Sequence, residues 1–200
     1  MKLYAKILYT LLILFLLTLS GCSSKPIITD SWIDENYDGR QFGKILVIGA
    51  AEKITFRNLY EGELVQQLQN KGIEAIPSYE ILPYNNMLTR EIVLSAIEKS
   101  DIDSVLITSL VDRSQKTIYY AIDNSSFYSY YSGYYKEINK NVKTASYEIP
   151  VLHLKTNLYD VRSEKLIWSM TSESEYKYNI KSINSAIALI LERLREDGLI

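Results

Sequence analysis

The chain has 200 residues, with 22 Lys and Arg against 24 Asp and Glu, and a single cysteine. A mildly acidic chain without a basic run gives no reason to expect nucleic acid binding. One cysteine allows no internal disulfide, so the stability of the folded part has to come from a packed core. Tyrosine is the unusual residue, with 17 copies against 4 of Phe and 2 of Trp.

The first residues have the layout of a lipoprotein signal. Lys2 and Lys6 precede an uncharged apolar run over residues 7–19. Its length of about 13 residues suits a signal peptide and falls short of the about 20 residues that a membrane-spanning helix needs. The run ends in the sequence Leu19, Ser20, Gly21, Cys22.

This ending resembles the cleavage motif of bacterial lipoproteins. The resemblance implies that residues 1–21 are removed and that Cys22 receives a diacylglycerol thioether and an acylated amine, which together anchor the chain firmly. Ser23 follows where inner-membrane lipoproteins often have Asp, so the resemblance favours the outer membrane, facing the periplasm. The alternatives are a secretory signal with a chance cysteine and a short membrane anchor.

The next segment, residues 22–43, is expected to be the lipidated N-terminus and a tether. Ser23, Ser24, Lys25 and Pro26 do not favour regular structure, and Asp38-Gly39 is a turn signal. Trp32 either plugs the edge of the core or faces a partner. The remaining residues, 44–200, are long enough for a single domain.

Strand and helix patterns then alternate. Residues 44–50 form a continuous apolar run that predicts a strand buried on both faces. Helical spacing follows over 57–71, ended by Gly72, and a second short strand is predicted at 73–77. Thr89 is a candidate cap for a second helix with Ile92, Val93, Ala96 and Ile97 on one face, before a third strand at 104–111. This order predicts an α/β sheet with crossover helices.

The C-terminal part predicts a hairpin and a helix. Residues 147–159 alternate, with Leu152, Leu154, Thr156 and Leu158 on one face and His153, Lys155 and Asn157 on the other. A polar turn leads to a second strand at 166–170, and 180–196 is an amphipathic helix ended by Gly198. The predicted fold class is α/β (an α+β sandwich), with a mixed sheet of about five strands and three helices in the order β-α-β-α-β-β-β-α. A Tyr/Ser-rich insertion at 116–147 precedes the hairpin.

Three stretches together carry a family resemblance. They are Trp32, Asp34, Tyr37-Asp38-Gly39, Phe42 and 44–47; then Arg57, Glu61, Leu64-Val65, Leu68, Gly72, Ala75 and Ser78-Tyr79; then 158–160 with 163–168, ending in Ile167-Trp168. The chain resembles small uncharacterised Gram-negative envelope lipoproteins. It is more distantly similar to the α/β domains of the curli-secretion lipoprotein, of penicillin-binding-protein activator lipoproteins and of the Tol periplasmic protein N-terminal domain. The resemblance implies a fold and a compartment but no catalytic residue, since fold does not fix function.

Reactive groups are sparse. His153 is the only histidine, so any serine triad would have to use it, and no GxSxG motif supplies the serine. One histidine without a free thiolate is a poor transition-metal site, and no phosphate-binding glycine motif is present, so no cofactor and no metal are expected. Asp101 and Asp103 read as a solvated turn, and Arg57 and Glu61 as an ordinary i,i+4 ion pair. The sequence therefore predicts a protein that is not an enzyme.

The insertion holds the densest tyrosine cluster of the chain. Its members are Tyr119, Tyr120, Tyr128, Tyr130, Tyr131, Tyr134 and Tyr135, interleaved with Ser, Asn and Gly. Such a composition suits a contact surface, and the alternative is a variable insertion or extended hairpin arms. We therefore expect a membrane-anchored periplasmic lipoprotein acting as a non-enzymatic interaction module, whose envelope protein partner is unknown. The second hypothesis is a glycan or small-ligand binder that uses the Tyr-rich segment.

Overall fold

The computed structural model describes residues 25–51, 53–83, 90–121, 144–175 and 180–200. Its strands are β1 (Ile27–Ile33), β2 (Lys44–Ala50), β3 (Glu74–Pro77), β4 (Ser104–Ala121), β5 (Thr144–Asp160) and β6 (Lys165–Glu175). Its helices are α2 (Ile54–Gln69), α3 (Ser78–Ile81), α4 (Arg90–Ser100) and α6 (Ile180–Glu196). The signal segment, with Leu19, Ser20, Gly21 and Cys22, lies outside the described residues.

All six strands join one mixed sheet in the order β1-β6-β5-β4-β2-β3. β2 pairs in parallel with β3 and with β4, and these connections carry the crossover helices. The pairs β4–β5, β5–β6 and β6–β1 are antiparallel. The predicted α/β class with a mixed sheet is confirmed.

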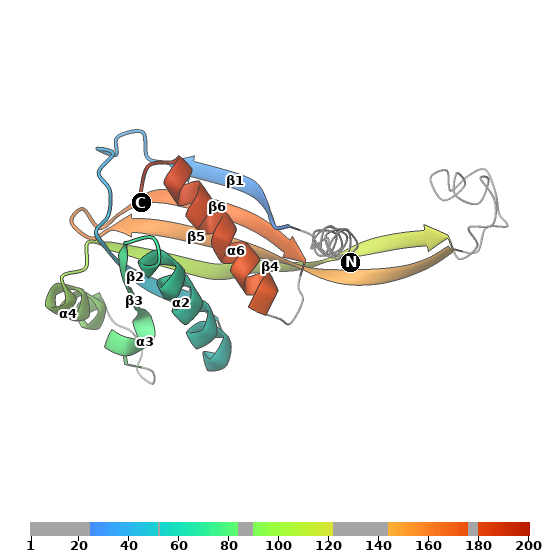
Figure 1. Ribbon diagram of the computed structural model, residues 1–200, viewed down its shortest axis with the longest axis horizontal. Helices are drawn as coiled ribbons and strands as arrows, with labels where there is room; N and C mark the ends of the chain where they lie inside the picture. The colour runs from blue at the N-terminus through green and yellow to red at the C-terminus, as the bar shows by residue number, and fades with distance from the viewer. Residues whose placement is uncertain (1–24, 52, 84–89, 122–143, 176–179) are drawn as a thin grey trace, which may run out of the picture.

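Helices α2 and α6 lie side by side over one face of the sheet (Figure 1). Their buried side chains pack with those of the strands in one cluster, to which Leu64, Ile187 and Trp168 belong. On the opposite face a smaller cluster joins Ile97 of α4 to Leu46 and Val105. β2 is therefore buried on both faces, as its continuous apolar run predicts.

The structure has an N-terminal strand, β1, that the sequence analysis does not predict. Residues 22–43 were expected to form a tether, but Ile27–Ile33 is an edge strand that pairs with β6. Six of its seven residues are exposed. Its sequence also lacks the apolar alternation that marks a half-buried strand, so no sequence pattern predicts it. Trp32 keeps 47% of its surface exposed, so it does not plug the core.

The long hairpin strands are a second difference. The third strand was expected to end at residue 111, yet β4 continues to Ala121, and β5 begins at Thr144 rather than at 147. β6 likewise runs to Glu175, beyond the predicted 166–170. The face alternation predicted for β5 is confirmed, since Thr156 and Leu158 are fully buried while Lys155 is exposed.

The predicted helices are present with small shifts at their ends. α6 has the predicted bounds, α2 begins three residues early at Ile54, and α4 begins at Arg90, so that Thr89 lies outside the described residues. Gly72 after α2 has φ +82° and Gly198 after α6 has φ +73°, the left-handed conformation that ends helices. The short α3 had no sequence signal. Of the helices described, none has the length and apolarity to cross a membrane.

Candidate functional site

The outer half of the β4–β5 hairpin projects beyond the rest of the sheet (Figure 1). β2 accompanies β4 only as far as Ser109, and β6 accompanies β5 only as far as Val151. Beyond these points, residues 115–121 of β4 pair with residues 144–150 of β5, and no other strand of the described residues pairs with them. We call this two-stranded segment the arm.

The two faces of the arm differ in chemistry. On one face, Lys116 lies opposite Ile149 and Ile118 lies opposite Tyr147. On the other face, Gln115 lies opposite Pro150 and Thr117 opposite Glu148. Tyr147 is 52% exposed, and Ile118 and Ile149 are half-buried. We call Lys116, Ile118, Tyr147 and Ile149 the apolar arm face.

The structure places two of the seven cluster tyrosines. Tyr119 and Tyr120 are consecutive residues of β4 near the end of the arm, opposite Ser146 and Ala145. Tyr128, Tyr130, Tyr131, Tyr134 and Tyr135 lie outside the described residues.

The only histidine lies at the base of the arm with a serine and a carboxylate. His153 Nε2 is 2.8 Å from the Ser114 hydroxyl, and its Nδ1 is 3.4 Å from Glu173 Oε1. Sequence patterns do not predict this grouping, because its three residues lie on three different strands. Serine catalysis also needs oxyanion donors and a recess that excludes water, whereas Ser114 lies on an exposed stretch of strand.

A buried ion pair occupies the carboxyl ends of β2 and β3. Arg57 Nε donates to Glu61 Oε1 at 2.9 Å, which confirms the pairing that their spacing predicts. Glu61 is fully buried, however, and its carboxylate also accepts from the Gly49 amide at 2.9 Å and from the Ser78 hydroxyl at 2.7 Å. The Tyr79 amide adds a longer bond at 3.3 Å.

This network sits where open α/β sheets commonly bind ligands. The chain after β2 enters α2 on one face and leads to β3, and the chain after β3 enters α4 on the other face and leads to β4, so the strand order reverses beside the carboxyl end of β2. Here the side chains of Glu61 and Ser78 occupy the position that a ligand would take. Packing is also tight beside Gly49, where an added Cβ would lie 3.1 Å from the Tyr60 ring. The arrangement therefore serves to tie β2, α2 and α3 together.

Tyr60 extends the buried polar contacts toward the middle of the sheet. Its hydroxyl donates to Thr108 Oγ1 at 2.7 Å, and Thr108 lies 3.0 Å from Thr156 Oγ1. Burial raises the pKa of the Tyr60 hydroxyl, although the Thr108 hydrogen bond opposes the rise. The tyrosine remains protonated and acts as a structural donor.

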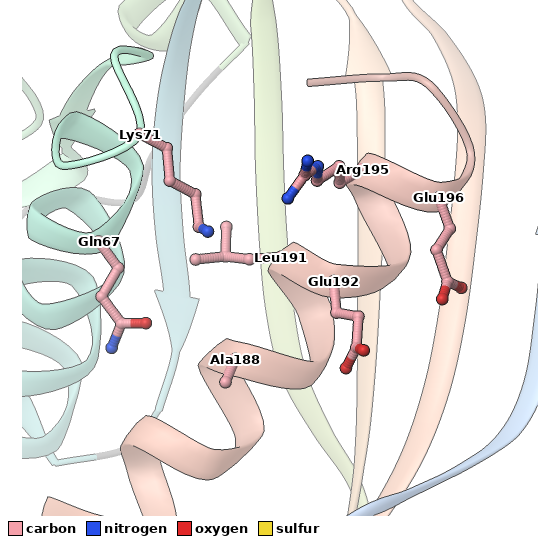
Figure 2. Close-up of a pocket in the computed structure, with 7 residues that line it drawn as sticks. All are labelled: Gln67, Lys71, Ala188, Leu191, Glu192, Arg195 and Glu196. Atoms are coloured by element: carbon pink, nitrogen blue, oxygen red, sulfur yellow. The ribbon is translucent and has the colours of Figure 1, made fainter.

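An open recess of about 500 Å³ lies between the C-terminal parts of α2 and α6. Lys71 and Arg195 extend over Leu191 from its two sides, and Glu192 and Glu196 turn away from them (Figure 2). Both helices end here, and helix C-termini carry partial negative charge. The positive charges of Lys71 and Arg195 thus offset the partial negative charge at the two helix ends. Little positive charge is then left to attract an anion to the recess.

The two carboxylates that the sequence analysis interpreted as a solvated turn, Asp101 and Asp103, can also be placed. Asp103 accepts hydrogen bonds from the amides of Gly43 at 2.7 Å and Lys44 at 3.2 Å, so it holds the start of β2. Asp101 is exposed and has φ 55°, as a turn residue after α4. Within the described part of the chain, His, Asp and Glu form no group of three that could hold a metal ion.

Comparisons with known proteins give a likeness of fold alone. No protein-family model matches the chain, and no curated protein matches its sequence. Among solved structures, the chain is similar to the PelC dodecamer from Paraburkholderia phytofirmans, at 12% identity and a TM-score of 0.47 over 88% of this chain and 99% of that one. It is also similar to lipoprotein GNA1162 from Neisseria meningitidis, at 15% identity and a TM-score of 0.40 over 77% of this chain and 99% of that one.

Proposed function

We propose that the protein is a lipid-anchored, non-enzymatic interaction module of the bacterial envelope, held by Cys22 at the periplasmic face of the outer membrane. The signal-like start of the chain supports the anchor. The single observation that carries the interaction role is the arm, which pairs with no third strand among the described residues.

A two-stranded ribbon is marginally stable in water. In the arm, Lys116, Thr117, Glu148 and Pro150 are exposed, and Tyr147 is half-exposed. The arm therefore buries little within the chain itself and gains most from contact with another envelope component. The partner that we propose is an envelope protein bound through the Tyr-rich end of the arm.

An in-cell crosslinking pull-down tests this partner. The intact chain is compared with a form that lacks residues 119–135, and mass spectrometry identifies the captured proteins. A matched form keeps the full length but carries Tyr119→Ser and Tyr120→Ser. A defined envelope protein that the intact chain captures and the deletion loses supports the proposal, and partial loss with the double serine form would assign part of the contact to these two tyrosines.

Two other outcomes would contradict the proposed surface. Capture of the same partner by both forms would move the interaction away from the Tyr-rich end. Capture of no protein by either form would favour the glycan-binding hypothesis, for which saturable binding of peptidoglycan fragments, lost on Tyr→Ser changes in 119–135, is the measurement.

The grouping of Ser114, His153 and Glu173 favours a second candidate, a serine hydrolase. In that role His153 would accept the Ser114 proton and Glu173 would orient the ring. We propose that the group is structural, since His153 joins three neighbouring strands. Turnover of a nitrophenyl ester by the purified protein, abolished by Ser114→Ala, would overturn the non-enzymatic assignment, and turnover that Ser114→Ala leaves unchanged would not involve this group.

A further inference from the structure

The chain enters the sheet at the same end from which the arm projects. β1 runs antiparallel to β6, and its first residue, Ile27, lies opposite Glu173. Glu173 lies opposite His153, which lies opposite Asp112 at the base of the arm. Ile27 and Asp112 are therefore level with each other across the sheet.

The lengths of the two segments at this end are unequal. From Cys22 to Ile27 the chain spans at most about 18 Å, even when fully extended at ~3.6 Å per residue. From Asp112 to Ala121, β4 continues outward for about 30 Å at ~3.3 Å per residue. A lipid surface that holds Cys22 thus lies at most about 18 Å beyond the level of Ile27 and Asp112, whereas the end of the arm at Ala121 lies about 30 Å beyond that level.

We propose that the apolar arm face rests on the phospholipid membrane that anchors Cys22. This inference rests on the proposed lipidation of Cys22 and goes beyond the proposed function, because it adds a second membrane contact that fixes the orientation of the domain. Because the arm reaches farther outward than the tether allows the membrane to be, it meets the lipid headgroups and lies along the membrane surface.

The chemistry of the two faces selects which one meets the lipid. Tyrosine is enriched at membrane–water interfaces, where its ring lies among apolar chains and its hydroxyl stays wet. Ile118 and Ile149 add apolar area beside Tyr147, and the Lys116 ammonium can reach lipid phosphates from the same face. The opposite face carries Glu148, which anionic headgroups repel.

Site-directed fluorescence in vesicles tests the contact. The full lipidated protein is reconstituted in phosphatidylethanolamine–phosphatidylglycerol vesicles with one new cysteine carrying an environment-sensitive dye. Acylated Cys22 is not available to the dye. The test position is Tyr147→Cys, and the matched control is Glu148→Cys, the next residue on the opposite face.

We expect lipids brominated on their acyl chains to quench the dye at 147 at least about threefold more than the dye at 148. Adding Ile118→Asp should abolish this difference, whereas Thr117→Asp on the other face should preserve it. A dye at 147 that stays in water would overturn the inference, and so would equal quenching at 147 and 148, which indicates an arm without a lipid-facing side.

Failure of this test is distinguishable from failure of the proposed function. If the dye at 147 reports water while the protein still floats with the vesicles, the anchor stands and the arm contact is wrong. If Cys22→Ser leaves the cellular protein bound to the membrane as firmly as before, the lipidation premise itself is wrong.

Discussion

Replacing Glu61 by alanine tests how much the buried ion pair between Arg57 and Glu61 contributes to the stability of the fold. The substitution removes the acceptor for the Gly49 amide, the Arg57 guanidinium and the Ser78 hydroxyl at once. Removing one partner of a buried ion pair typically costs about 3–5 kcal/mol. The Arg57 side chain keeps 16% of its surface exposed, so water partly solvates its charge, and we expect a loss near the lower end, about 3 kcal/mol.

Equilibrium unfolding in urea measures this loss on a form that begins at Ser23. With a denaturant slope of about 2 kcal/mol per molar, the midpoint should fall by about 1.5 M. The matched control is Glu63→Ala, two residues along the same helix and only half-buried, which should change the free energy of unfolding by less than about 0.5 kcal/mol. A loss below about 1 kcal/mol for Glu61→Ala would refute the assignment of this network as a structural tie.

The remaining predictions concern single contacts. Gly49→Ala should destabilise the fold by about 1–3 kcal/mol in urea unfolding, because its Cβ would meet a ring at 3.1 Å, whereas Gly62→Ala within α2, with its nearest contact at 3.5 Å, should be neutral or stabilising by up to ~1 kcal/mol. Burial alone would raise the pKa of Asp160, but hydrogen bonds from its turn and the charge of a nearby arginine outweigh burial and lower it. Its stabilising contribution is thus complete above the ordinary aspartate pKa and is lost as pH falls below about 4. In Asp160→Asn the free energy of unfolding should therefore fall less between pH 7 and pH 3 than it does in the parent protein. An equal fall in both proteins would contradict this. Trp168→Phe removes the 2.7 Å hydrogen bond that the indole Nε1 donates to Asp197 and should cost at least about 1 kcal/mol of unfolding free energy. An unchanged free energy of unfolding would contradict a stabilising role for this hydrogen bond.

The parts of the fold that the sequence predicts are those whose burial is strong and local. β2 and α6 have the predicted bounds because a continuous apolar run and a helical stripe survive in one stretch of sequence. The Arg57–Glu61 pair follows from helix spacing alone. Ser78 joins them from a distant segment, and only the packing of β3 beside β2 brings it there.

The arm shows the opposite case. Residues 147–150 of β5 lie in the predicted alternating strand, whereas β4 has three consecutive polar residues, Arg113, Ser114 and Gln115, where it enters the arm, so no apolar period of two marks its outward continuation. Hairpin pairing with the partner strand holds it instead. The sequence therefore indicates an unusual composition at 116–147 without locating where the strands end.

The edge strand β1, which the sequence did not predict, and the arm point to one side of the molecule. On β5, odd-numbered residues share a face, so Ile149 of the apolar arm face lies on the same side of the sheet as Asn157. Asn157 lies opposite Ser169, which lies opposite Trp32 of β1. Trp32 is half-exposed there, on the side away from α2 and α6. Burial within the chain therefore stabilises β1 and the arm less than it stabilises the central strands, because most of their side chains on this side stay exposed or half-buried.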